Sequence, residues 1–422
     1  IKERLDFTCS VFSPSGGIVA NAPHVPAMIG SMAFAVKWQI EHWKDQIHDG
    51  DVILSNAPVA GGTHLPDLTV ITPVFDSNGT IIFWTASRGH HADIGGTLPG
   101  SMPPNSRELW EEGAFFKAFK LVENGRFKEK ELAEILYTEP NKIEGCSGSR
   151  CLNDNIADLK AQIAANNKGV DLIRSLMEEY GQDVVHLYME MIQKSSELAV
   201  RNLLKTVYES FGSEPLEGED FMDDGTPIHL KVTIHPEDWS ADFDFTGTGP
   251  EVYANWNAPI AITHSSIIFS LRCMVNSDIP LNQGCIAPIN VIVPEGCFLK
   301  PSTQAACCAG NVLTSQRLAD TVFKVFQYCG ASQGCMNNFT FGIDGENGFG
   351  YYETICGGSG AGPTWDGTSG VHTNMTNTRI TDPEILERRY PVILRQFGIR
   401  EGSYGFGKHV GGCGVIREIE FG

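Results

Sequence analysis

The sequence is poor in positive charge. It has 31 Lys and Arg residues against 51 Asp and Glu residues, which gives a formal net charge of -20 at pH 7. A surface with this excess of negative charge repels polyanions over most of its area. We therefore exclude nucleic acid as a partner.

Long apolar runs are also absent. No stretch approaches the roughly 20 apolar residues that a membrane span requires, and no apolar core follows the charged start IKERLDFTCS, as a signal peptide would need. We expect a cytoplasmic protein with no membrane partner. Because the sequence starts at Ile1 and reaches the strand-like DFTCSVF almost at once, we also expect a piece of something longer.

The CxxC motif is missing although the chain has 12 cysteines, which removes support for a zinc knuckle or a thioredoxin-like centre. Most of the cysteines lie in apolar or Gly-rich runs, including Cys273, Cys285, Cys297 and the adjacent pair Cys307 and Cys308. Disulfides are the alternative, but these surroundings favour buried free thiols and a reducing compartment.

A standard nucleotide-binding motif is missing as well. The run GGSGAG at residues 357–362 resembles a loop that binds an anion through backbone N–H groups. It lacks the Lys-Ser/Thr of a P-loop and the GxGxxG spacing of a dinucleotide fold. We expect the chain by itself to hydrolyse no ATP.

What the sequence does contain predicts an α+β fold, β-rich in its N- and C-terminal parts with a helical middle segment. Short apolar runs separated by Gly and Pro predict strands over residues 1–150, around one helix near residues 29–43. Between residues 153 and 208 apolar residues recur every three to four positions on both sides of Gly181, which predicts two long helices. Alternating strands and a helix near residues 315–328 follow. We divide the chain into 1–150, 151–215 and 216–422.

Two polar clusters carry the clearest chemical signal. The first is THLPD, with His64 and Asp67, and the second is GHHAD, with His90, His91 and Asp93. If the strands between them pair through the turn at residues 76–79, both clusters lie at the same end of the hairpin. Three His and two Asp then offer nitrogen and oxygen ligands for Mn, Fe or Zn. The alternative is that these are loop residues that hydrogen-bond their own backbone.

Other polar residues are weaker candidates. Arg317 and Arg379 could clamp a substrate carboxylate, although an internal salt bridge explains either of them equally well. Paired carboxylates at residues 223–224 and 242–244 could form a second site, but their patterns are typical of a hairpin turn and of the solvent face of a strand.

A series of motifs, in order along nearly the whole chain, resembles the hydantoinase B/oxoprolinase family. They include NAPHVPAMIGSM, GDVILSNAPVAGGTHLPDLTVITPVF, ASRGHHADIGGTLPGSMPP, DLKAQIAANNKG, AGNVLTSQR and TNTRITDPEILERRYPV. Within this family the chain looks most like the C-terminal half of the eukaryotic type of ATP-dependent 5-oxoprolinase.

The resemblance implies the hydrolytic half of that enzyme, which opens 5-oxo-L-proline to L-glutamate while a hydantoinase A-type half uses ATP and Mg. It further implies a divalent metal held by His64, Asp67 and His91, with His90 and Asp93 beside it as catalytic candidates. Arg317 and Arg379 are the substrate-binding candidates, and we expect a homo-oligomer. The alternatives are a hydantoinase, an acetone or acetophenone carboxylase-type subunit, or a non-catalytic docking scaffold.

Overall fold

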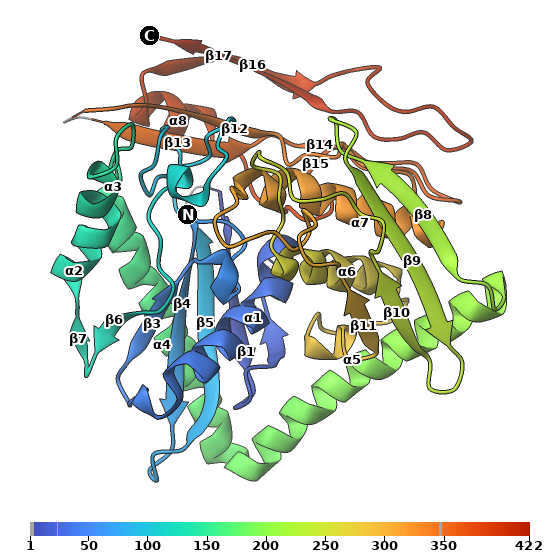
Figure 1. The fold of residues 1–422 in the computed structure, drawn as a ribbon, viewed down its shortest axis with the longest axis horizontal. Coiled ribbons are helices and arrows are strands. Elements are labelled where there is room, and N and C mark those ends of the chain that lie inside the picture. Colours follow the sequence, from blue (N-terminus) through green and yellow to red (C-terminus); the bar gives the residue numbers. More distant parts are fainter. Residues whose placement is uncertain (1–3, 23, 346–347) are drawn as a thin grey trace.

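The computed structural model describes residues 4–22, 24–345 and 348–422, and they form the α+β fold that the sequence predicts (Figure 1). The helices are α1 (Pro26–Trp43), α2 (Glu129–Ala133), α3 (Glu139–Asn141), α4 (Leu152–Tyr180), α5 (Gln182–Phe211), α6 (Ile260–Met274), α7 (Ser315–Val325) and α8 (Pro383–Arg389). The predicted helices near residues 29–43 and 315–328 correspond to α1 and α7, and the two predicted long helices correspond to α4 and α5.

The N-terminal part forms a seven-stranded antiparallel sheet in the order β2-β1-β5-β4-β3-β6-β7. Its strands are β1 (Phe7–Phe12), β2 (Ile18–Asn21), β3 (Val52–Ser55), β4 (Asp67–Phe75), β5 (Ile81–His90), β6 (Phe119–Glu123) and β7 (Arg126–Phe127). The strands β4 and β5 pair as the predicted hairpin, and Asp76 Oδ1 stabilises its turn by accepting from the backbone N–H groups of Asn78 and Thr80.

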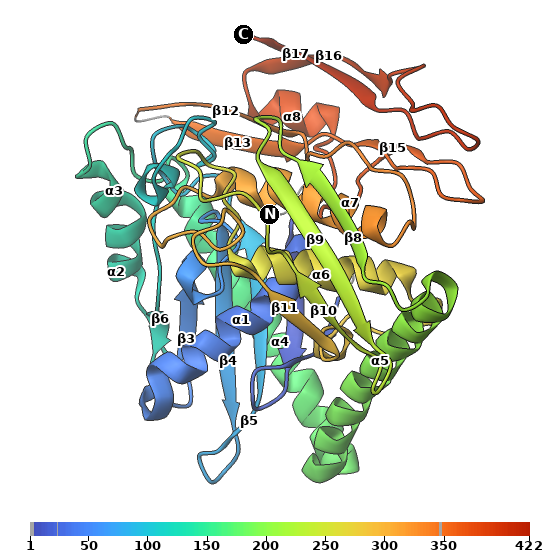
Figure 2. The ribbon, with the colours of Figure 1, turned by 45° about the vertical axis from the view of Figure 1, so that its right-hand side comes forward.

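Helices α1 and α4 cover opposite faces of this sheet (Figure 2). On one face, Ile71 and Trp84 pack against α1. On the other face, Leu68 and Val70 pack against α4. Because successive residues of a strand point to opposite faces, this packing fixes the direction of every side chain on the hairpin.

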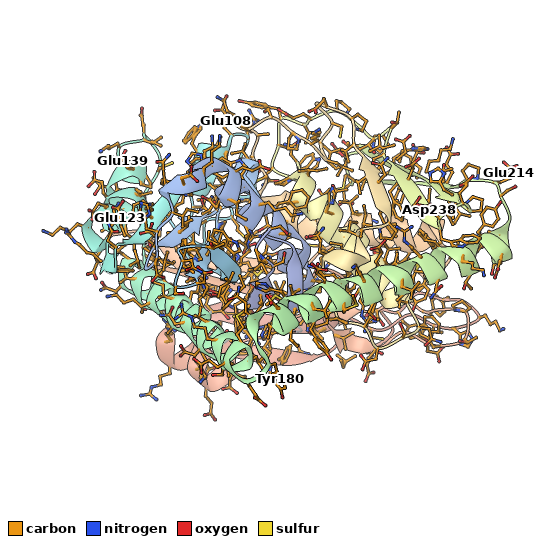
Figure 3. The ribbon with its side chains drawn as sticks, turned by 90° about the horizontal axis from the view of Figure 1, so that it is seen from below. Glu108, Glu123, Glu139, Tyr180, Glu214 and Asp238 are labelled. Carbon is orange, nitrogen blue, oxygen red and sulfur yellow. The ribbon has the colours of Figure 1, made fainter. Side chains whose placement is uncertain are left out.

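The long helices α4 and α5 connect the two ends of the molecule. They meet at Gly181, whose positive φ of 89° suits glycine. Figure 3 shows Tyr180 at this junction and Glu214 beyond the far end of α5. The helix α5 thus leads from the first sheet to the second.

The second sheet has the order β11-β10-β9-β8, with a parallel pair β10–β11 and antiparallel pairs elsewhere. Its strands are β8 (Leu216–Phe221), β9 (Pro227–His235), β10 (Ser240–Asp244) and β11 (Ile289–Ile292). Residues 223–224 form the predicted turn between β8 and β9. The sheet packs with α5, α6 and α7 around the largest core cluster.

Helix α6 is an element that the sequence analysis missed. Ten of its residues are buried, and four of these are Ser or Thr, so the buried face does not appear as a stripe of apolar residues in the sequence. It lies so close to α1 that a Cβ atom on Gly30 would be 2.7 Å from the Cα of Ser265.

The last third adds three hairpins, β12–β13, β14–β15 and β16–β17. Their strands are β12 (Asn338–Ile343), β13 (Phe349–Thr354), β14 (Gly357–Gly358), β15 (Ser369–Val371), β16 (Val392–Ile399) and β17 (Val415–Phe421). Helix α8 lies between the second and third hairpins along the chain.

All twelve cysteines lie in the described ranges and are free thiols, as the sequence analysis expected. Burial is less uniform than expected. Cys285, Cys297, Cys307 and Cys308 are buried, but Cys273 is exposed. An apolar run in the sequence therefore did not guarantee a buried thiol.

Candidate metal centre

The hairpin β4–β5 brings the two polar clusters together. Asp67 at the start of β4 is paired with His90 at the end of β5, and His64 lies one turn before Asp67. His64 Nδ1 is 3.0 Å from Asp67 Oδ2, and His90 Nδ1 is 3.3 Å from Asp67 Oδ1. All three side chains are buried, and their ligand atoms lie within 4.8 Å of one another.

The polar atoms of this cluster are incompletely satisfied by protein. Among the residues that the structure describes, His64 Nδ1 lies near Asp67 but has no hydrogen bond of acceptable geometry, and His90 Nε2 has no partner. Orphaned buried nitrogens cost stability unless something else binds them.

The spacing of the donors suits a metal ion. Two donor atoms bound to one first-row ion at about 2.1 Å, with an angle of about 90° to 110°, lie roughly 3.0–3.4 Å apart. The distances from His64 Nδ1 to Asp67 Oδ2 and from His90 Nδ1 to Asp67 Oδ1 fall in this range, and the second is also that of a hydrogen bond between the same atoms. The donor set therefore fits a divalent cation.

The surroundings of Asp67 and His90 keep both side chains in the protonation state that can bind a metal. Burial alone would raise the pKa of Asp67, but the His64 and His90 rings beside it hold that pKa well below its ordinary value. Burial lowers the pKa of His90 to about 3. At neutral pH the carboxylate is thus ionised and the His90 imidazole is neutral, as metal ligation requires.

His91 lies on the opposite face of the hairpin, toward α4. Its Nε2 is 3.1 Å from Gln162 Oε1, and its Nδ1 is 3.1 Å from the side-chain nitrogen of Asn155. Burial lowers the pKa of His91 to about 4, so the neutral ring donates to Gln162 and accepts from Asn155. The structure thus brings His90, and not His91, to His64 and Asp67.

Asp93 serves the loop that follows β5. Its Oδ1 accepts from the backbone N–H groups of Gly95 and Arg150, at 2.9 and 3.0 Å. Its Oδ2 accepts from the backbone of Gly100 at 2.8 Å and from the Arg150 guanidinium at 3.1 Å. These contacts match the alternative interpretation, in which an acidic residue organises its own loop.

The two arginine candidates have different surroundings. Arg317 is 3.8 Å from Asp220 and 3.6 Å from Asp223, which is the internal salt bridge named as its alternative. Arg379 is exposed, and its backbone N–H donates to the carbonyl of Arg4. A substrate-binding role for either stays a prediction.

Asp6 and Tyr352 are site neighbours that the sequence analysis missed. The carbonyl of Asp6 accepts from the His90 N–H at 3.0 Å, and burial together with the charge of Asp67 raises the pKa of the Asp6 carboxyl to about 6. The ring of Tyr352 in β13 stacks on His90 with 3.9 Å between centroids. Long-range pairing places Asp6 there, because β1 runs antiparallel to β5 with Phe7 opposite Gly89. Tyr352 comes from β13, which belongs to a separate hairpin.

Arg88 anchors the same face of the hairpin. It is fully buried two residues before His90, and its guanidinium donates to Thr69 Oγ1, Ser31 Oγ and the carbonyl of Gly61. These bonds tie both strands to α1 and hold the end of the hairpin in place.

The sequence profile of the hydantoinase B/oxoprolinase family matches residues 1–422. The chain belongs to this family. Two members are similar to it over its whole length: 5-oxoprolinase 1 of Arabidopsis thaliana, with 57% identity over 434 residues, and 5-oxoprolinase of Saccharomyces cerevisiae, with 51% identity over 436 residues.

The chain covers 34% of each of these two proteins. The expectation of a half is therefore corrected, because the chain spans about a third of the length of the curated relatives it matches. Their whole-protein activity does not transfer to it directly.

The fold also occurs in a solved structure, the ATP-dependent caprolactamase from Pseudomonas jessenii. The TM-score is 0.85 and the identity is 23%, with 99% of this chain and 72% of that chain covered. At this identity the likeness establishes the fold alone.

Within the described ranges, no helix has both the length and the apolar character needed to cross a membrane.

Proposed function

We propose that this chain is the hydrolytic part of an ATP-dependent 5-oxoprolinase, which opens 5-oxo-L-proline to L-glutamate. The observation that carries the proposal is the buried cluster of His64, Asp67 and His90, whose ligand atoms lie within 4.8 Å of one another. The 5-oxoprolinase names of relatives that align with the whole chain support the choice of substrate.

In this proposal His64, Asp67 and His90 hold one divalent ion of Mn, Zn or Fe. This assignment replaces the expected ligand His91 by His90, because both ring nitrogens of His91 are already hydrogen-bonded to side chains of α4. When bound, such an ion polarises an amide carbonyl or makes a water molecule more acidic. Asp6, buried next to His90, is the candidate for a further oxygen ligand.

The remaining residues position and protect the reacting groups. With Nδ1 facing Asp67, His90 keeps Nε2 for a hydrogen bond to the substrate. The Tyr352 ring covers one side of the His90 imidazole and excludes water there. Asp93 and Arg150 fix the loop after β5, so we assign Asp93 a positioning role.

ATP enters the proposal through another part of the protein. The chain carries no P-loop sequence, and the curated relatives extend well beyond the aligned region. We propose that an ATP- and Mg-using part activates the amide oxygen, and that the activated ring reaches the cluster for hydrolysis. A cytoplasmic location and a homo-oligomer remain part of this proposal.

The test is a substrate panel on the full-length protein with ATP: 5-oxo-L-proline, hydantoin, caprolactam, and acetone with bicarbonate. We expect L-glutamate and ADP from 5-oxo-L-proline, and loss of glutamate formation in Asp67→Asn. The matched control is Asp183→Asn, an exposed residue in the first turn of helix α5, which should keep activity.

Each alternative has a distinct outcome. Turnover of hydantoin or of acetone, without turnover of 5-oxo-L-proline, contradicts the proposed substrate. Full glutamate formation by Asp67→Asn contradicts the role of the cluster and favours a docking scaffold.

A further inference from the structure

A side chain from the C-terminal part reaches the metal cluster. Asn311 lies in the π-helical turn Gly310–Thr314 that leads into α7, and its side-chain Nδ2 is 3.5 Å from His64 Nε2. The residue is 5% exposed. Its Oδ1 is buried and has no partner in the described part of the chain.

The backbone around Asn311 is tightly held. Glu112 Oε1 accepts from the backbone N–H groups of Cys307 and Cys308, at 3.0 and 3.1 Å. The carbonyl of Asn255 accepts from the N–H of Gly310 at 3.1 Å. A Cβ atom on Gly310 would lie 2.0 Å from the Asn257 carbonyl oxygen, so this turn cannot move away without losing its packing. Asn311 is therefore placed against His64 by the fold.

The chemistry of His64 determines what this contact needs. Its Nδ1 faces Asp67 without hydrogen-bond geometry, as a nitrogen lone pair aimed at an ion does. A neutral imidazole carries one proton, which must then be on Nε2. Metal-ligating histidines donate their second ring N–H to an acceptor that fixes tautomer and ring orientation.

The amide of Asn311 can supply that acceptor. The oxygen and nitrogen of an Asn amide are interchangeable by a half-turn of the side-chain amide. That turn places the amide oxygen opposite His64 Nε2, and the ring N–H becomes a donor for the buried Oδ1. The turned amide and the Nε2–H tautomer of His64 thus support each other.

We propose that Asn311 is a positioning residue for His64: its amide oxygen accepts the Nε2–H and keeps Nδ1 directed at the metal. This inference rests on the metal centre of the proposed function. It also links the turn before α7 to the loop before β4, so that the C-terminal part completes a site whose ligands all come from the N-terminal part.

The test is the zinc affinity of the metal-free full-length protein, measured by competition with a chromophoric chelator. Asn311→Leu and Asn311→Ser remove the acceptor and should weaken zinc binding about 10- to 100-fold. Asn311→Asp keeps an acceptor and should bind zinc at least as tightly as the wild type.

The matched control is Asn166→Leu. Asn166 is an equally buried amide, and it donates to the Val70 carbonyl and Thr72 Oγ1 of the same hairpin from α4. This variant should leave zinc affinity unchanged. Urea unfolding of every variant checks the fold. If Asn311→Leu does not fold, the zinc affinities of Asn311→Ser and Asn311→Asp test the inference.

A second readout is the tautomer of His64 in ¹⁵N-histidine spectra. We expect the Nε2–H form in the wild type and a mixture of tautomers in Asn311→Leu. Wild-type zinc affinity in folded Asn311→Leu or Asn311→Ser, or an Asp variant as weak as the Leu variant, overturns the inference. Equal zinc binding by wild type and His64→Ala instead overturns the metal centre itself.

Discussion

The two faces of the β4–β5 hairpin carry neighbouring histidines in opposite situations. His90 points to the face with His64 and Asp67, and its Nε2 is unsatisfied by the described residues. His91 points to α4, where Asn155 and Gln162 bind both of its ring nitrogens. A fully bonded histidine is part of the packing, whereas an incompletely bonded one in a cluster of ligand atoms marks a binding site.

The first prediction removes a ligand from the unsatisfied face. His64→Ala should weaken zinc binding more than about 100-fold, because loss of a ligand costs more than loss of a supporting residue. This corresponds to about 2.8 kcal/mol or more of binding free energy. Chelator competition on the folded variant measures it, and wild-type affinity would remove His64 from the centre.

The second prediction concerns the satisfied face. His91→Phe removes the hydrogen-bond partner of Gln162 Oε1 and one partner of Asn155 Nδ2. The substitution should therefore lower the free energy of unfolding by roughly 2–4 kcal/mol. Zinc affinity of the folded fraction should stay at the wild-type value. Urea unfolding and zinc titration on the same sample separate the two effects. A large loss of zinc affinity without a loss of stability would mean that His91 binds the metal.

The third prediction extends the comparison to buried carboxyls. Unlike Asp67, Glu112 lies among backbone N–H groups, Ser106 and thiols, and burial raises its pKa from 4.5 to about 7. Its protonated form therefore stabilises the fold fully below pH 4.5, and this contribution is lost as pH rises through about 7.

Glu112→Gln mimics the protonated acid and removes this titration. The stability of the wild type relative to Glu112→Gln should thus fall by roughly 1–3 kcal/mol between pH 5 and pH 8. Urea unfolding at both pH values measures the change. A difference that is constant with pH would mean that Glu112 has the same pKa in the folded and unfolded states.

The sequence predicted the hairpin because its signals are local. Asp76 and Gly79 suit the turn, and β-forming runs lie on both sides of it. The convergence of His64, Asp67 and His90 followed from that pairing. The divergence of His90 and His91 was also accessible, because neighbouring residues of a strand face opposite sides.

Other features depend on contacts between distant segments. Tyr352 and Asn311 reach the cluster from more than 200 residues away, and Asp6 arrives only because β1 pairs with β5. Helix α6 was missed because its buried residues include Ser and Thr as well as apolar residues, which hides the apolar periodicity by which helices are recognised. Local patterns could not predict these features.

The most direct test of the account compares two variants, His90→Ala and His91→Ala, in the full-length protein. Both change one histidine at adjacent positions, and bound metal per folded protein is measured by elemental analysis after zinc loading and dialysis. We predict that His90→Ala loses the metal and that His91→Ala retains about one equivalent, as expected for a single site. Metal retained by His90→Ala and lost from His91→Ala would contradict the assignment of the two faces.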